Sequence, residues 1–218
     1  MRWPQFRWPD ILGPDLMTQA TARTTPRPRG IFLAGHPALD FLNTRMRVNG
    51  ETVEVLRDDE GVRHWLGQAG FPAPKAVADL KLGSLLSAAL RLRENVRALV
   101  EARKAGRRGN VAVLNSFLEE GPSHPKLIWN APRAVSVERI RRRGSAEAIL
   151  APVAESAAEL LAMGNFALVK HCEDRSCVLW FVDQTKAHRR RWCSMALCGN
   201  RNKVAAHRKR ARRGGRVA

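Results

Sequence analysis

The chain has 218 residues, enough for one sizeable hydrophobic core and a small additional module. Its 38 lysines and arginines against 20 acids give a formal net charge of +18. The composition argues against a membrane protein, because no apolar run approaches the ~20 residues that a spanning helix needs. It favours a soluble protein that binds polyanions, with nucleic acid the first expectation and an acidic membrane surface the second.

The N-terminal part is expected to start with a flexible leader over residues 1–29, which is rich in Pro, Arg and Thr. Order is predicted from Gly30, with short strands over 31–37 and 52–56 and either a helical turn or a strand over 38–45. The segment from Asp58 to Leu66 begins with acids, as helix N-termini prefer, and predicts a helix that ends at Gly67 or Gly70.

The clearest helical pattern runs from Ser84 to Lys104, where apolar residues form one stripe. Ser84 suits the N-cap and Gly106 suits the end of this helix. A shorter helix is predicted over 110–119, and residues 126–129 and 134–138 are typical of two strands of a hairpin. The segment 145–163 predicts a helix that Pro152 should kink or begin. Residues 30–165 are therefore expected to form an α+β domain, mainly helical with short strands.

All four cysteines lie near the C-terminus and form two pairs of equal spacing: Cys172, Cys177, Cys193 and Cys198. Two close thiolate pairs are typical of a structural zinc site, because zinc takes four soft or borderline ligands in a tetrahedron. Two disulfides are the first alternative, but residues 1–9 lack the apolar core of a secretory signal, and cytoplasmic thiols stay reduced. An iron–sulfur cluster or a redox pair is the second alternative.

The cysteines belong to a predicted module over residues 166–213. Residues 166–169 and 178–182 are typical of strands, and the segment from Asn200 to Arg213 predicts a helix that starts directly after the last cysteine. This order of knuckle, strand and ligand-bearing helix predicts a small treble-clef-like zinc module, in which the metal replaces a core that so few residues cannot build. Residues 214–218 are expected to be a disordered tail.

The positive charge is concentrated in this module. Residues 170–218 contain fourteen lysines and arginines against three acids, which is +11 of the total +18. A solvated basic tail would explain the last few residues, but not the charges that alternate with the cysteines and with Trp180 and Trp192. The pattern favours a surface that meets phosphates, whereas the two tryptophans are expected to pack on the zinc knuckle more than to stack on bases.

The C-terminal segment resembles a known bacterial family. The run Cys198-Gly199-Asn200-Arg201, preceded by Arg191-Trp192-Cys193-Ser194-Met195 and followed by Lys203, is similar to the CGNR zinc finger. Upstream, residues 35–44 (GHPALDFLNT) and Trp65-Leu66 resemble the ABATE domain that precedes this finger in the family. The resemblance implies a stress-induced transcription regulator of the bacterial cytoplasm that binds DNA and uses one structural zinc ion but catalyses no reaction.

Roles for particular residues follow from these expectations. Asp183 and Asn200 are expected to brace the two knuckles by hydrogen bonds, although Asn200 could equally be a simple helix N-cap. Gly199 is expected to permit a tight turn at the metal. Arg201, Asn202 and Arg208 are candidates for reading bases. Eight basic residues are candidates for phosphate contacts: Arg189, Arg190, Arg191, Arg201, Lys203, Arg208, Lys209 and Arg210.

The N-terminal domain is expected to sense a signal or to form a homodimer. His36, Asn43, Arg45 and Trp65 stand in its most motif-like stretch, either as ligand contacts or as residues that cap turns and complete the core. Two other function classes stay open. The module could bind RNA or ribosomes, or it could be a treble-clef nuclease with His188, Asn200 and His207 around a second metal ion.

Overall fold

A computed structural model describes residues 30–48, 50–72, 80–131, 134–141 and 144–214; the predicted leader over 1–29 and the last four residues lie outside them. The strands form three antiparallel two-stranded sheets: β1 (Arg45–Val48) with β2 (Glu51–Glu54), β3 (Ser123–Ala131) with β4 (Ala134–Arg141), and β5 (Val169–His171) with β6 (Trp180–Val182). The helices are α1 (Pro37–Leu42), α2 (Asp59–Gln68), α3 (Ser84–Lys104), α4 (Ala112–Glu119), α5 (Ala146–Met163), a π-helical turn η2 (Met195–Gly199) and α6 (Asn200–Gly214). The fold is therefore α+β as predicted, mainly helical with short strands.

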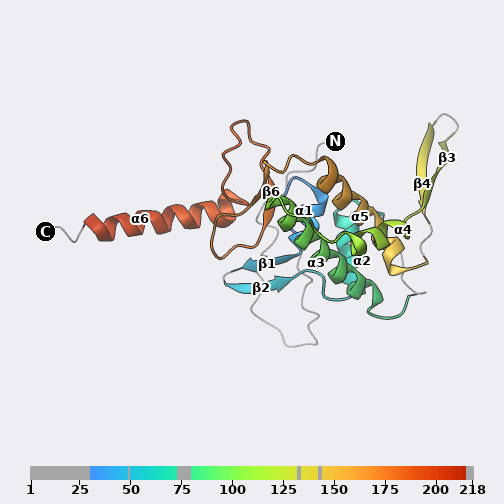
Figure 1. Ribbon diagram of the computed structural model, residues 1–218, viewed down its shortest axis with the longest axis horizontal. Coiled ribbons are helices and arrows are strands. Elements are labelled where there is room, and N and C mark those ends of the chain that lie inside the picture. The colour runs from blue at the N-terminus through green and yellow to red at the C-terminus, as the bar shows by residue number, and fades with distance from the viewer. Residues whose placement is uncertain (1–29, 49, 73–79, 132–133, 142–143, 215–218) are drawn as a thin grey trace.

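Helix α3 is the centre of the N-terminal part and packs on α1, α2, α4 and α5 (Figure 1). Its predicted apolar stripe is buried, with Leu92 and Val96 fully inaccessible to solvent. Trp65 of α2 and Phe41 of α1 are also fully buried, with ring centroids 5.2 Å apart. None of the helices within the described ranges is both long and apolar enough to cross a membrane.

The N-terminus of α3 differs from the prediction. Gly83, with φ +79°, is the N-cap, and Ser84 is the first helical residue. The carboxylate of Asp59 replaces a local cap, because it accepts hydrogen bonds from the backbone N–H groups of Gly83 and Leu86, both at 2.7 Å. A carboxylate at this end also complements the helix dipole. The cap therefore comes from α2, about two dozen residues earlier in the chain, where a local pattern does not reveal it.

One other local prediction was wrong. The segment 31–37 is not a strand: the Ala34 N–H donates to the Asp40 side chain at 3.0 Å and not to a neighbouring strand, although Ala34 C=O accepts from Val182 of β6 at 2.7 Å. Pro152 does not mark the start of α5, which begins after the Ser145 N-cap and continues through the proline to Met163; the kink stays a prediction. The hairpin is longer than predicted but has the predicted strand pairing.

The N-terminal part and the cysteine module share one hydrophobic core, which includes α1, α3 and α5 together with Val169, Phe181 and the four cysteines. Asn43, at the end of α1, connects the two parts most closely. Its side-chain amide donates to Trp180 C=O at 2.9 Å and accepts from Trp180 N–H at 3.0 Å. Beyond this joint body, α6 extends in one direction and the β3–β4 hairpin in another (Figure 1).

Candidate metal centre

The four cysteines come from two segments of the chain that the fold brings together. Cys172 directly follows β5, Cys177 closes the next turn by donating its N–H to Asp174 C=O at 2.9 Å, and Cys193 lies in the segment before η2. Cys198 lies within η2, whose N-cap is Ser194. All four side chains are buried, with exposed fractions from 2% to 7%, and none forms a disulfide.

The sulfur positions fit one tetrahedral metal ion. The four Sγ atoms lie within 4.8 Å of one another, with Cys177–Cys193 at 3.8 Å and Cys193–Cys198 at 3.6 Å. Four thiolates at the usual zinc–sulfur distance of ~2.3 Å would lie about 3.8 Å from one another. The quartet can therefore bind one zinc ion without moving the backbone, which agrees with the predicted ligand set.

Four buried thiols at these distances cannot all ionise without a cation. Burial, together with repulsion from Cys177 and Cys172, raises the pKa of Cys198 to about 12. Hydrogen bonds from Cys177 and Cys193 lower the pKa of Cys172. Cys172 can therefore be a thiolate while the neighbouring cysteines stay protonated and donate to it. A bound zinc ion would supply the positive charge that permits all four sulfurs to be thiolates, which is the chemistry of a structural zinc site.

Asp174 connects the first knuckle to α6. Its Oδ2 accepts hydrogen bonds from Arg201 Nη2 at 2.7 Å and from Asn202 Nδ2 at 2.6 Å, and its Oδ1 accepts from the Ser176 hydroxyl at 2.6 Å. Burial raises the pKa of this carboxyl, but the hydrogen bonds from Ser176 and Arg201 outweigh it and hold the pKa well below its usual range. Arg201 also approaches Cys198 Sγ at 3.6 Å, where it stabilises negative charge on sulfur.

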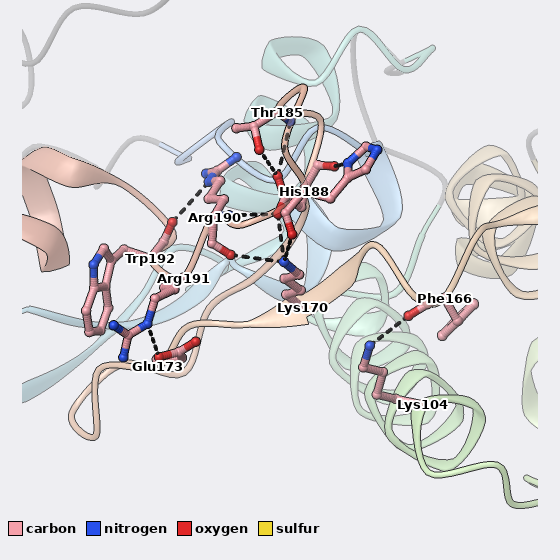
Figure 2. A network of polar contacts seen from close by, with 10 residues as sticks. Lys104, Phe166, Lys170, Glu173, Thr185, His188, Arg190, Arg191 and Trp192 are labelled. Carbon is pink, nitrogen blue, oxygen red and sulfur yellow. Dashed lines mark hydrogen bonds and ion pairs between the residues drawn. The ribbon is translucent and has the colours of Figure 1, made fainter.

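Asp183 organises the loop between β6 and Cys193, and Figure 2 labels its partners Lys170, Thr185 and Arg190. Asp183 is fully buried and accepts hydrogen bonds from Lys170 Nζ at 2.7 Å, Arg190 N–H at 2.8 Å and the Thr185 hydroxyl at 2.6 Å. Burial raises its pKa, but the bonds from Lys170 and Thr185 outweigh this and leave the pKa well below its usual range. Asp183 thus fixes the backbone that leads to the second cysteine pair, which is the kind of bracing predicted for it.

Asn200 and Gly199 lie at the junction of η2 and α6. The Asn200 side chain is exposed and makes no hydrogen bond with the residues that the structure describes, so its predicted bracing role stays a prediction. Gly199 is buried, and a Cβ there would lie 2.5 Å from Met195 Sδ and 3.1 Å from Trp192 Cδ1. The glycine is needed because neighbouring side chains pack directly on its backbone.

The predicted phosphate contacts divide into two groups. Arg190, Arg191 and Arg201 have partners within the chain: Arg190 stacks on Phe181 at 4.3 Å and donates to Cys193 C=O, while Arg191 pairs with Glu173 at 2.6 Å. The second group contains the other five residues, of which four are exposed and one, Lys209, is placed only by its position on α6. Arg189, Lys203, Arg208 and Arg210 are exposed, and Lys209 lies on α6 between the last two.

The residues singled out in the N-terminal stretch are placed mainly in structural roles. His36 caps α1 through Nδ1, which accepts from Ala38 N–H at 3.2 Å, and Trp65 is fully buried. Asn43 binds β6, and Arg45 is exposed on β1. His188 and His207 are also exposed, and within the described ranges the four cysteines are the one group of at least three His, Cys, Asp or Glu able to share an ion.

Sequence reasoning missed Asp174, Lys170 and Asn202 as parts of the site. Asp174 lies between the first two cysteines, three residues before Cys177. Its position within the zinc knuckle was the signal that could have indicated a role at the site. Asn202, a candidate for reading bases, instead donates to Asp174 and, at 2.9 Å, to Cys198 C=O. Its amide therefore holds the start of α6 against the metal knuckle.

Comparison with known proteins gives two matches that divide the chain. Residues 35–164 match the family model ABATE, which is described as "putative stress-induced transcription regulator". Residues 169–211 match the model of the CGNR zinc finger. No curated relative matches the chain.

Proposed function

The chain belongs to the ABATE family and carries a CGNR zinc finger, and from this premise we propose that it is a cytoplasmic DNA-binding transcriptional regulator. One zinc ion stabilises the finger, and the basic surface beyond it binds the phosphates of duplex DNA. The proposal assigns the chain no catalytic step. Four free cysteines agree with a reducing compartment, where thiols bind metal in preference to forming disulfides.

The charge and exposure of helix α6 are the observation that supports this proposal. Asn200–Gly214 contains seven lysines and arginines and no acid, and Lys203, Arg208 and Arg210 are exposed. Among the described helices and strands, α6 packs mainly on η2; its first turn also bonds Asp174, and the helix extends well beyond the body of the molecule (Figure 1). Fifteen helical residues span about 22 Å, and the major groove admits a helix of this kind.

The contacts of α6 separate its first turn from the rest. Arg201 and Asn202 hold the helix to Asp174, so they fix its direction relative to the zinc knuckle. Lys203, Arg208 and Arg210 are exposed and make no such anchoring bond within the part of the chain that the structure describes, so they are available to phosphates and bases. We therefore assign the DNA contacts to Lys203, Arg208, Lys209 and Arg210, with Arg208 retained as a base-reading candidate and Arg189 as a flanking phosphate contact.

The salt dependence of DNA binding tests this assignment. Each phosphate contact contributes about −0.9 to the slope of log affinity against log salt on duplex DNA. Arg208→Ala and Arg210→Ala should each make the slope shallower by about this amount and weaken binding across sequences. Arg107→Ala is the matched control, since Arg107 is an exposed arginine between α3 and α4, and it should leave the slope unchanged.

Capture of genomic fragments by the zinc-loaded protein separates the function classes. Enrichment of sites that share a motif supports a sequence-reading regulator. If instead single-stranded RNA binds more tightly than duplex DNA at the same salt concentration, the RNA-binding alternative replaces the proposal. If Arg208→Ala and Arg107→Ala weaken binding equally, α6 is not the contact surface.

A further inference from the structure

The β3–β4 hairpin is the part of the described structure that packs least on the rest. It joins α4 to α5 and protrudes from the body on the side away from α6 (Figure 1). Within the described ranges, each of its strands packs substantially only on the other. A single two-stranded hairpin is at best marginally stable in water, so a ribbon of this length needs a further surface to hold it.

One face of this ribbon is apolar and exposed. Leu127 lies opposite Val137, and Trp129 lies opposite Val135 in the antiparallel register. Because side chains alternate between the faces of a strand, these two pairs are on the same face. Their exposed fractions are 63% for Leu127, 66% for Val137, 67% for Trp129 and 45% for Val135, and none contributes to the hydrophobic core.

The opposite face of the ribbon has a different character. Asn130 donates a hydrogen bond to the Ser136 hydroxyl at 2.7 Å, and both Ile128 and Ser136 are half-buried. The hairpin is therefore apolar on one face only, where the four exposed apolar side chains lie together. Contiguous exposed apolar surface of this kind in a soluble protein marks an interaction site.

We propose that this face is a dimer interface and that its occupant is the same face of a second copy of this chain. Two identical ribbons related by a two-fold axis bury both apolar faces at once, as isologous interfaces do. Stacked sheets pack about 10 Å apart, which suits interdigitated Leu, Val and Trp side chains.

The area available agrees with a weak dimer. Full burial removes roughly 100 Å² for a Val or Leu side chain and roughly 230 Å² for Trp. With the exposed fractions of the four residues, two copies would bury about 650 Å² of apolar surface. Homodimer interfaces are about 65% apolar, so the total approaches about 1,000 Å², near the lower limit for a specific interface. The dimer should therefore dissociate on dilution.

This interface is independent of the proposed DNA contacts, because the hairpin and α6 extend from different sides of the body (Figure 1). Dimerisation leaves both copies of α6 exposed. Loss of the dimer would therefore leave the salt slope per protomer unchanged, and loss of DNA binding would leave the dimer unchanged. The two proposals can fail separately.

Sedimentation velocity of the full zinc-loaded chain over a wide concentration range tests the proposal. The wild type should shift from monomer to dimer as concentration rises. Trp129→Ser with Val137→Thr should remain monomeric, and because both side chains are exposed, the fold should tolerate the change. Leu82→Ser is the matched control, since Leu82 is 94% exposed outside the hairpin, and it should dimerise like the wild type.

Hydrogen exchange of residues 123–141 at low and high protein concentration distinguishes the possible occupants. Protection that increases with concentration, and that Trp129→Ser with Val137→Thr abolishes, supports a second copy. Protection that does not depend on concentration means that another part of the same chain covers the face, and overturns the proposal. A wild type that stays monomeric, or a dimer that survives the double substitution, overturns it as well.

Discussion

Substitution of Asn43 by alanine should destabilise the whole chain, because this amide connects the N-terminal part to the finger. Asn43 is 2% exposed and satisfies both backbone groups of Trp180, accepting from its N–H at 3.0 Å and donating to its C=O at 2.9 Å. Trp180 is the first residue of β6 and is itself buried. Alanine would leave both backbone groups without a partner in a site that water does not reach.

The expected loss follows from those two groups. A buried donor or acceptor without a partner costs roughly 1–3 kcal/mol. Two such groups give a decrease of about 4 kcal/mol in the free energy of unfolding, a large part of the 5–15 kcal/mol typical of a domain. Asn43→Asp keeps the volume and the acceptor but lacks the donor to Trp180 C=O, so at neutral pH it should not restore wild-type stability.

Urea unfolding at saturating zinc, followed by circular dichroism and by tryptophan fluorescence, measures this change. The midpoint should fall while the slope of free energy against urea stays constant, since the parts continue to unfold together. Asn165→Ala is the control, because the exposed Asn165 side chain accepts one local bond from Ala167 N–H at 3.1 Å. Its loss should be below about 1 kcal/mol.

Three outcomes would refute this reasoning. A change below about 1 kcal/mol in Asn43→Ala would mean that the bonds to Trp180 contribute little to the joint core. Separate transitions for the two probes in the wild type would mean that the finger and the N-terminal part unfold independently. Wild-type stability in Asn43→Asp would mean that the volume of the side chain, and not its hydrogen bonds, is what matters.

Four further perturbations should have measurable effects. Cys198→Ser should lose the zinc ion, and Asp174→Ala, which removes the link from knuckle to α6, should weaken zinc binding about 10–100-fold in competition with a chelator. Burial raises the pKa of Asp40 from 3.8 to about 7, so the folded state binds the proton more tightly than the unfolded state between these values. Stability should consequently fall by about 3 kcal/mol from pH 5 to pH 8, and Asp40→Asn should remove this slope in urea unfolding. A fragment that ends at Gly164 should be unfolded by circular dichroism, because Asn43 and the buried face of α1 lose their partners; a cooperative, soluble fragment would show that the N-terminal core is sufficient alone.

The sequence predicts well those features that a short pattern determines. The apolar stripe of α3 gives its limits from Ser84 to Lys104, and the cysteine spacing gives four buried sulfurs within 4.8 Å. Both follow from local rules, since a helix repeats every 3.6 residues and a zinc site needs its ligands in two short loops. Even the pairing of the hairpin strands follows from two β-prone runs that lie close together in the sequence.

Features that depend on contacts between distant segments are not predictable in this way. Asp59 caps α3 from another helix, Asn43 binds a strand that lies 137 residues later, and Asp174 links two parts of the finger. Each is a common polar residue in an ordinary local setting, so the sequence contains no signal of its partner. The predicted boundary between residues 30–165 and the cysteine module likewise gives no hint of the shared core, because that core is visible only in three dimensions.

The arginines of the finger show why charge by itself overestimates the binding surface. Arg190 is half-buried and fastens the loop before Cys193 to the N-terminal part, with Nη2 donating to Leu33 C=O at 3.3 Å. Arg201 holds the start of α6 to Asp174. Arg190 therefore links the finger to the N-terminal part, whereas Arg201 fixes α6 within the finger, at the turn that the zinc ion would also stabilise. Both guanidinium groups are engaged by the protein itself, which leaves the exposed Lys203, Arg208 and Arg210 as the better candidates for phosphate contacts.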